Sequence, residues 1–158
     1  MTTPIALQDL CLPTGTCYGC GSANPDGLQI KSYWSADGQV VVATITPDAK
    51  YASGFKGALY GGVIASLIDC HSNWTAMAFG YRAEGREAGS APLIASVTGS
   101  LGVKYVKPTP MGVPLHLRAW VDGEVGRKTR VICELGSADA VTATGDSVFV
   151  RIDPALFE

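Results

Sequence analysis

The sequence predicts an α+β domain in which an antiparallel sheet of about six strands wraps around one long central helix. Three observations support this fold class. Six runs of the sequence are rich in Val, Ile, Thr and aromatic residues, short turns join several of them, and one long helical segment is apolar on almost every side. A helix with so little polar surface must be buried, and the antiparallel sheet is the element that can cover it.

The first two strands are expected to form a hairpin. Residues 28–36 and 39–47 are β-rich and flank the dipeptide Asp37-Gly38, which favours a tight turn between strands. The glycine-rich segment that follows, residues 48–60, is predicted to be a loop.

The central helix is predicted to begin at the pair Gly61-Gly62. It is expected to end near Gly80, because glycine is a common stop signal for a helix. The polar residues 81–92 then form a loop that leads into the remaining strands.

Four further strands are predicted in residues 93–108, 113–123, 127–140 and 141–152. In the second of these runs, apolar and polar side chains alternate from residue 115 to residue 122, which is typical of a strand with one buried and one wet face. Short turns between the last three runs predict a meander.

Four residues of the central helix fall on one narrow, more polar stripe, counted at 100° per residue. The stripe consists of Gly62, Ser66, Asp69 and Asn73. Asp69 is the only acidic residue between positions 49 and 83, so it is not part of a generally charged surface. It is either a buried acid bonded to a loop or to a partner subunit, or a functional group.

Composition limits the other functions open to this chain. Its 158 residues fit one domain, residues 1–158, in which residues 1–27 form a glycine- and cysteine-containing leading segment. A net charge of -2 argues against general binding of nucleic acid or of anionic membranes. We find no apolar run long enough for a membrane span and no leader-like N-terminus, so we expect a cytoplasmic protein.

The cysteines do not suggest a metal site or a disulfide framework. Cys17 and Cys20 form a C-x-x-C pair, which is half of a zinc site, and no second pair completes it. Cys11, Cys70 and Cys133 are scattered along the chain. The favoured interpretation of "CYGCG" is a tight glycine-rich turn, and no metal or other cofactor is expected.

The start of the central helix is a candidate donor site. Unpaired N–H groups and a partial positive charge gather at a helix N-terminus, so Gly61 and Gly62 can donate to a carbonyl oxygen. Asp69 lies roughly 10–12 Å further along the axis at 1.5 Å per residue. One helix therefore does not bring its own start and its own acid to one small reacting group, whereas an antiparallel partner helix would.

Two stretches of the sequence resemble a known family. "YGGVIASLID", residues 60–69, and "TGSLGVKYVKPTPMG", residues 98–112, are similar to hotdog-fold acyl-CoA thioesterases of the phenylacetic-acid-degradation type, close to the 4-hydroxybenzoyl-CoA thioesterase branch. The family motif is His-Gly-Gly with an acid eight residues after the first glycine, and Gly61 and Asp69 have that spacing. The resemblance implies a hotdog fold and side-by-side dimers with active sites at their interface.

The resemblance also implies roles for single residues. The Gly61 N–H corresponds to the oxyanion donor, and Gly62 permits close approach of the thioester. Asp69 of the other subunit corresponds to the general base or nucleophile, and Thr98 to a residue that orients water or the acid. Tyr60 stands where the family usually has histidine.

The remaining candidates concern substrate binding. Ser66 and Asn73, on the stripe of Asp69, are expected to orient the acid or to line the pocket. The candidates for binding CoA phosphates are the basic residues of the later strands, Lys104, Lys107, Arg127, Lys128 and Arg130.

The leading hypothesis is an acyl-CoA thioesterase that acts as a homodimer or a dimer of dimers, with no metal, nucleic-acid or membrane partner. One alternative is a non-catalytic hotdog protein that binds acyl-CoA or a small acid, motivated by Tyr60. A hydratase or dehydratase is less favoured because it needs a histidine beside the acid. His71 lies about 200° around the helix from Asp69, and we expect it to be bonded to a nearby carbonyl instead.

Overall fold

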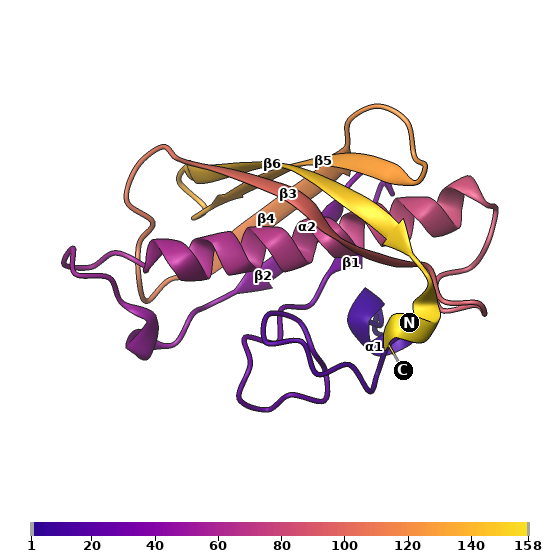
Figure 1. Ribbon diagram of the computed structural model, residues 1–158. Helices are drawn as coiled ribbons and strands as arrows, with labels where there is room; N and C mark the ends of the chain where they lie inside the picture. Colours follow the sequence, from indigo (N-terminus) through magenta and orange to yellow (C-terminus); the bar gives the residue numbers. More distant parts are fainter. Residues whose placement is uncertain (1, 158) are drawn as a thin grey trace.

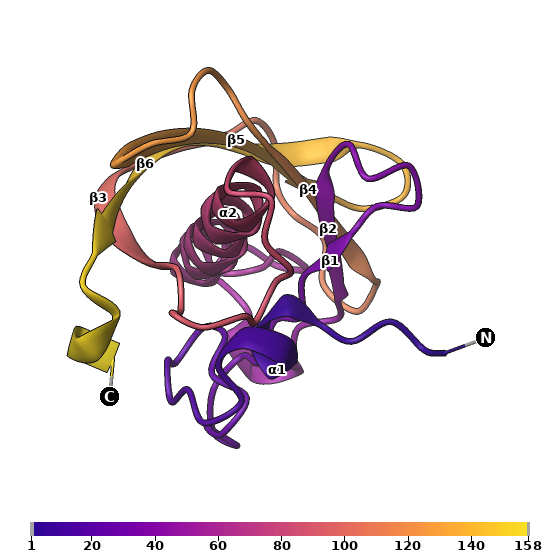
Figure 2. The ribbon, with the colours of Figure 1, turned by 90° about the vertical axis from the view of Figure 1, so that its right-hand side faces the viewer.

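A computed structural model describes residues 2–157. One long helix, α2 (Gly61–Ala83), lies in the concave side of a six-stranded antiparallel sheet (Figures 1 and 2). The strands are β1 (Tyr33–Trp34), β2 (Val41–Ile45), β3 (Ala95–Tyr105), β4 (Leu115–Val121), β5 (Lys128–Gly136) and β6 (Val141–Ile152). Three short helices complete the fold: α1 (Leu7–Cys11), η1 (Ala49–Tyr51) and η2 (Pro154–Phe157). The fold class predicted from the sequence is confirmed.

The sheet order is β1-β2-β4-β5-β6-β3. The predicted meander is confirmed for β4, β5 and β6, which are neighbours in both sequence and space. The hairpin turn at Asp37-Gly38 is also present, with Gly38 at φ +68°. In Figure 2 the leading segment with α1 lies on the side of α2 that the sheet leaves open. No helix within residues 2–157 combines the length and apolar character that a membrane crossing requires.

The core forms where α2 faces the centre of the sheet. Leu67 and Ile68 of the helix and Leu117 and Val131 of the sheet are at most 1% exposed. The helix approaches β6 closely at Gly145, where an added Cβ would lie 2.4 Å from Cγ2 of Ile68. The less buried positions of the first turns of α2 include all four members of the predicted stripe, so the burial of the helix follows its sequence pattern.

The first predicted strand is much shorter than expected. Only Tyr33 and Trp34 pair with β2. The backbone of the preceding residues is bonded elsewhere, because the N–H groups of Leu28 and Ile30 donate to the carbonyls of Tyr18 and Gly19. The backbone of these residues is therefore bonded to the glycine-rich turn rather than to a neighbouring strand.

The helix also ends three residues later than predicted. Gly80 is an interior position, where an added Cβ would lie 3.3 Å from Cγ2 of Ile94, so this glycine is a packing residue. Gly85, at φ +63°, is the true stop. The N–H groups of Gly85 and Arg86 donate to the carbonyls of Arg82 and Tyr81, which is the Schellman arrangement of a helix C-terminus.

β3 is a long strand at the edge of the sheet. Within the described residues it pairs only with β6, and the register shifts between Thr98 and Ser100. Val97, Leu101 and Tyr105 are 40%, 40% and 55% exposed. A long edge strand with apolar side chains is a surface that soluble proteins normally cover.

His71 joins three parts of the fold inside the protein. Its Nε2 lies 3.1 Å from the Val41 carbonyl and its Nδ1 lies 2.8 Å from Oγ of Ser32. Because a carbonyl only accepts, Nε2 carries the proton and Ser32 donates to Nδ1. Gln8 in turn donates to Ser32. The expectation that His71 is bonded to a carbonyl is confirmed.

The burial of His71 makes stability depend on pH. Burial lowers its pKa from 6.5 to about 4, so the folded protein keeps it neutral while the unfolded chain protonates below 6.5. Stability from this group is fully present above that pH and falls as the pH drops toward 4. We expect a loss of roughly 3 kcal/mol over this window, measured by urea unfolding at a series of pH values.

The control for this prediction is His71→Gln, which has no titratable group at this position. Its free energy of unfolding should fall less steeply between pH 6.5 and 4 than that of the wild type, whatever its absolute stability. Equal slopes for the two proteins would show that the acid sensitivity comes from other groups.

Candidate active site

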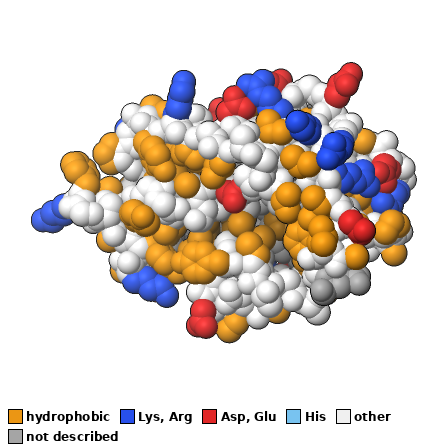
Figure 3. Space-filling view, in the orientation of Figure 1, with side chains coloured by type: hydrophobic (Ala, Val, Ile, Leu, Met, Phe, Trp, Pro, Cys, Tyr) orange, Lys and Arg blue, Asp and Glu red, His pale blue; other side chains and the backbone are white. Residues whose placement is uncertain are grey.

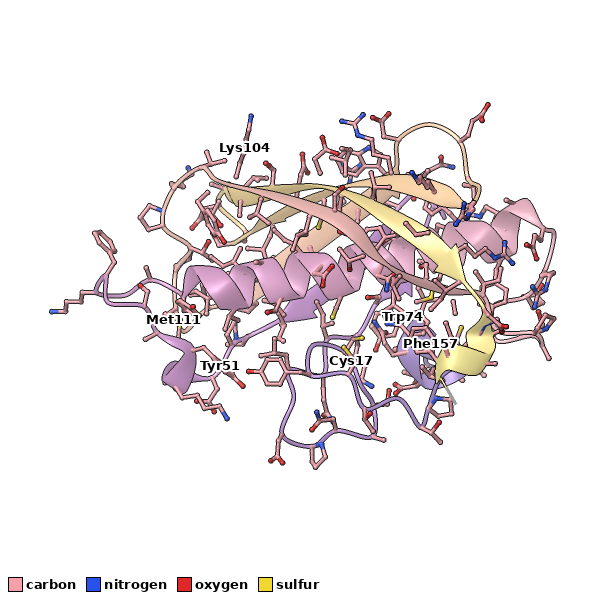
Figure 4. All side chains as sticks on the ribbon, in the orientation of Figure 1. Cys17, Tyr51, Trp74, Lys104, Met111 and Phe157 are labelled. Carbon is pink, nitrogen blue, oxygen red and sulfur yellow. The ribbon has the colours of Figure 1, made fainter. Side chains whose placement is uncertain are left out.

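A cavity of about 550 Å³ lies between α2, β3 and the leading segment. Asp69, Asn73 and Trp74 line it from the helix, and Ser96 and Thr98 line it from β3. Leu156 and Phe157 of η2 add an apolar wall. Figure 4 shows Cys17, Trp74 and Phe157 together on this side of the molecule. The cavity therefore combines one carboxylate with mainly apolar walls.

Asp69 is held by one strong hydrogen bond. Thr98 Oγ1 donates to Asp69 Oδ1 at 2.6 Å. The register shift in β3 directly follows Thr98, and such irregularities commonly re-aim a side chain near a functional site. Within residues 2–157, no Lys or Arg forms an ion pair with Asp69. The carboxylate is therefore oriented by Thr98 and partly exposed at the cavity wall.

Ser66 and Asn73, the other two polar side chains of the stripe, form no hydrogen bond with Asp69 among the described residues. Asn73 donates from Nδ2 to the Ser96 carbonyl at 2.9 Å, and Ser96 Oγ donates to Asn73 Oδ1 at 2.5 Å. Asn73 thus fastens the helix to β3 and lines the cavity. Ser66 donates to the Gly62 carbonyl at 2.8 Å and lies outside the cavity wall, so neither residue orients the acid.

Two tyrosines flank the start of α2. Tyr60 is the residue before the helix, and its ring lies so close to Gly62 that an added Cβ there would be 2.5 Å from the ring. Tyr105 Oη donates to the Gly61 carbonyl at 2.7 Å. The N–H groups of Gly61 and Gly62 have no hydrogen-bond partner among the described residues. They are the free donors that the sequence predicts at this position.

A second cavity, of about 340 Å³, lies beside this helix start. It is lined by Phe55, Gly61, Tyr105 and Lys107 among others. Of the basic residues predicted to bind CoA phosphates, Lys107 is the one that lines the same cavity as Gly61. Lys104 is directed away from α2 in Figure 4, on the other face of the sheet.

The remaining basic candidates do not join the helix start. Arg130 is paired with Asp122 and Asp146, at 2.6 Å to each carboxylate. Arg127 and Lys128 are exposed at the start of β5, and neither lines the cavity at Asp69 or the one at Gly61.

The helix start and the acid are separated within one chain. Gly61 and Asp69 belong to the same continuous helix, and eight residues at 1.5 Å per residue place them about 12 Å apart along its axis. Each also lines a different cavity. One chain thus supplies a donor site and an acid that do not meet at one reacting group.

One feature of this region differs from the sequence-based expectation. Cys70 is not scattered, because α2 brings it to the C-x-x-C turn, where its Sγ lies 3.7 Å from that of Cys17. Gly19 makes room for it, since an added Cβ there would lie 2.3 Å from Cys70 Sγ. The predicted tight turn itself is confirmed by the hydrogen bond from the Gly21 N–H to the Cys17 carbonyl, at 2.8 Å.

The three thiols change one another's acidity. Hydrogen bonds from Cys20 and Cys70 lower the pKa of Cys17, because they stabilise its thiolate. The same contacts raise the pKa of Cys20 and Cys70, because these two thiols serve as the donors. Only the return of the leading segment to the helix creates this cluster, and no local sequence pattern signals it.

Comparisons with known proteins show which proteins this chain resembles. No family model matches the chain. Over 108 residues the chain is 28% identical to the acyl-coenzyme A thioesterase THEM4 of Bos taurus, a match that covers 66% of this chain and 38% of that protein. The chain thus spans well under half the length of this curated relative.

Solved structures give a closer match. A thioesterase superfamily protein from Shewanella loihica is 33% identical, with a TM-score of 0.64 over 84% of this chain and 98% of that one. The PaaI protein of the E. coli phenylacetic acid degradation operon is 20% identical, with a TM-score of 0.63 over 80% of this chain and 81% of that one, and shares the fold. With one helix held in a six-stranded antiparallel sheet and this identity to the Shewanella protein, the chain belongs to the thioesterase superfamily and has the hotdog fold.

Proposed function

We propose that this protein is an acyl-CoA thioesterase, in which Asp69 of one subunit acts with the Gly61 N–H of another. The observation that carries the proposal is the Asp69 carboxylate, oriented by Thr98 at 2.6 Å in the wall of a largely apolar cavity. A largely apolar cavity with one oriented carboxylate fits an acyl group and a hydrolytic water. The acyl-coenzyme A thioesterase among the relatives supports the same substrate class.

The proposed reaction uses two kinds of group. The Gly61 N–H donates to the thioester carbonyl oxygen and stabilises the negative charge that develops there. Asp69 removes a proton from water as the water oxygen bonds to the acyl carbon. The carbon–sulfur bond then breaks, the proton passes to the departing thiolate, and the products are a carboxylic acid and the free thiol of CoA. In a second route Asp69 attacks the acyl carbon and the carbon–sulfur bond breaks to release the CoA thiolate. Water then cleaves the mixed anhydride into the carboxylic acid and the Asp69 carboxylate, and its proton passes to the thiolate.

A dimer would bring these groups together. Within the described residues one edge of β3 is unpaired, and its exposed Val97, Leu101 and Tyr105 offer an apolar surface beside α2. Figure 3 shows apolar side chains gathered on the face that carries α2 and β3, with most basic side chains near its rim. A second copy on this face, with its helix antiparallel, would place its Gly61 near this chain's Asp69. The proposed assembly is a homodimer or a dimer of dimers.

The proposal is tested with a panel of short, medium and aryl acyl-CoA substrates. Release of CoA thiol, followed with a thiol-reactive chromophore, should exceed the rate without protein for at least one class. Sedimentation at assay concentrations should show a dimer or tetramer. A monomer with full activity would contradict the shared site.

Thr98→Val should lower kcat about 10–100-fold, since a hydrogen bond to a charged group contributes about 1.5–3 kcal/mol and each 1.4 kcal/mol is a factor of ten. Thr98 positions Asp69, so KM should change little. Steady-state kinetics on the best substrate measures both constants. Thr98→Ser keeps the hydroxyl and should restore most of the rate, whereas equal rates for Thr98→Val and wild type would remove Thr98 from the mechanism.

One observation favours the alternative, a binding protein without turnover. The Tyr60 ring lies against Gly62 at the start of α2, where the family usually has histidine. If that ring covers the donor site in the assembled protein, calorimetry would show acyl-CoA binding while every substrate of the panel remains intact. A hydratase is not favoured, because His71 is fully buried and bonded to Ser32 and Val41.

A further inference from the structure

Three cysteine sulfurs meet beside the cavity of Asp69. Cys17 and Cys20 come from the turn of the leading segment and Cys70 comes from the middle of α2, and their Sγ atoms all lie within 4.8 Å of one another. All three side chains line the same cavity. The proposed hydrolysis does not use them.

The sulfur spacing matches that of ligands on one metal ion. In a tetrahedral site with zinc–sulfur bonds of about 2.3 Å, two sulfurs lie about 3.8 Å apart. The Sγ atoms of Cys17 and Cys70 are 3.7 Å apart. This distance is far beyond a disulfide bond of about 2.05 Å, so the two sulfurs are unbonded and spaced as two ligands of one metal ion would be.

The surroundings also fit a thiolate site. The Trp74 indole N–H lies 3.2 Å from Cys20 Sγ and donates to it, as groups around metal-bound sulfur commonly do. Gly19 lets Cys70 Sγ approach the turn. Within residues 2–157 no Lys, Arg or His forms an ion pair or hydrogen bond with the three sulfurs, so no cationic side chain there competes with a metal ion.

We propose that Cys17, Cys20 and Cys70 bind one Zn²⁺ ion, with the fourth position open to the cavity. Soft thiolate ligands favour Zn²⁺ over the hard cations Mg²⁺ and Ca²⁺. The three thiols lose their protons to the solvent when the ion binds. The ion would join the leading segment to α2 one residue after Asp69. This assignment departs from the expectation of a metal-free protein, because it depends on Cys70.

Metal content of the full-length protein tests the site directly. Protein purified without chelator and under reducing conditions should carry about one zinc per chain by mass spectrometry of the metals. After zinc is removed, added Co²⁺ should give the intense thiolate charge-transfer absorption and the visible bands of tetrahedral cobalt. Both readouts are independent of hydrolysis, so they remain informative if the proposed thioesterase activity fails.

Single-cysteine variants locate the site. Cys17→Ser changes an exposed side chain and should lower zinc affinity at least tenfold and abolish most of the cobalt charge-transfer band. Cys70→Ser should do the same. Cys11→Ser, which lies outside the cluster, is the matched control and should bind like the wild type. A chelator should lower the melting temperature of the wild type and of Cys11→Ser, but not that of Cys17→Ser.

Three results would overturn the proposal. The reduced wild type could bind neither zinc nor cobalt, or Cys17→Ser could bind both as tightly as the wild type. The third is a Cys17–Cys20 or Cys17–Cys70 disulfide, found by peptide mass spectrometry in metal-free protein that does not take up zinc after reduction. That result would assign the cluster to redox chemistry instead.

Discussion

Asp69→Asn should reduce kcat for acyl-CoA hydrolysis by about 10²–10⁴-fold, the usual contribution of a positioned general base. The amide keeps the size of the side chain and can still bond to Thr98 Oγ1, which now lies 2.6 Å from the carboxylate. It cannot take a proton from water. Substrate affinity should change much less than kcat, because the apolar cavity is unaltered. Single-turnover kinetics and calorimetry with the best substrate measure the two effects separately.

Asp139→Asn is the matched control for this variant. Asp139 is exposed in the turn between β5 and β6, so the substitution makes the same change of charge away from the cavity. Its kcat should equal that of the wild type. Retained full activity in Asp69→Asn, with unchanged folding, would show that Asp69 is structural.

The fold was predictable because its main pattern is local. The helix is apolar on nearly every side and the strands alternate apolar and polar side chains. Each of these local patterns predicts which of its residues are buried. The errors arose where a tertiary contact overrode a local signal. Gly80 looks like a stop but packs against Ile94, while Gly85 ends the helix at a positive φ. Residues before Tyr33 look like a strand but bond to the glycine-rich turn.

The features of the candidate site were likewise predictable only where they depend on local sequence. Asp69 and the glycines of the helix start could be found from sequence because a lone acid and a glycine pair stand out in an apolar segment. The Asp69–Thr98 contact followed only from family resemblance, since the two residues are 29 positions apart. No sequence pattern predicts the contact of Tyr105 with Gly61 or that of Cys70 with the C-x-x-C turn. Both contacts depend on how segments distant in sequence pack against α2.

Gly61→Pro tests the donor at the helix start by removing its N–H. The fold should tolerate this change, because proline is favoured at the first position of a helix and Tyr60, at φ -61° and ψ 130°, has a conformation compatible with a following proline. No internal hydrogen bond of the Gly61 N–H is lost within the described residues. We expect kcat to fall about 10²–10³-fold, the effect of losing one oxyanion donor.

Gly61→Ala is the control, since it adds a side chain but keeps the N–H. Its Cβ would lie 3.3 Å from the Tyr105 ring, a contact that a shift of a few tenths of an ångström relieves. Its kcat should stay within a few-fold of the wild type. Equal losses in Gly61→Pro and Gly61→Ala would assign the effect to crowding rather than to the donor.

Combining the two inactive variants tests whether the site is shared. The Asp69→Asn and Gly61→Pro chains are co-expressed with different affinity tags and purified as the mixed dimer. One chain lacks the carboxylate and the other lacks the N–H donor. If Gly61 of one subunit works with Asp69 of the other, one of the two sites contains only intact groups, and about half of the wild-type activity should return. If both groups came from one chain, every site would carry a defect and activity would stay at the level of the single variants. A mixed dimer of two Asp69→Asn chains, purified with the same tags, sets that baseline.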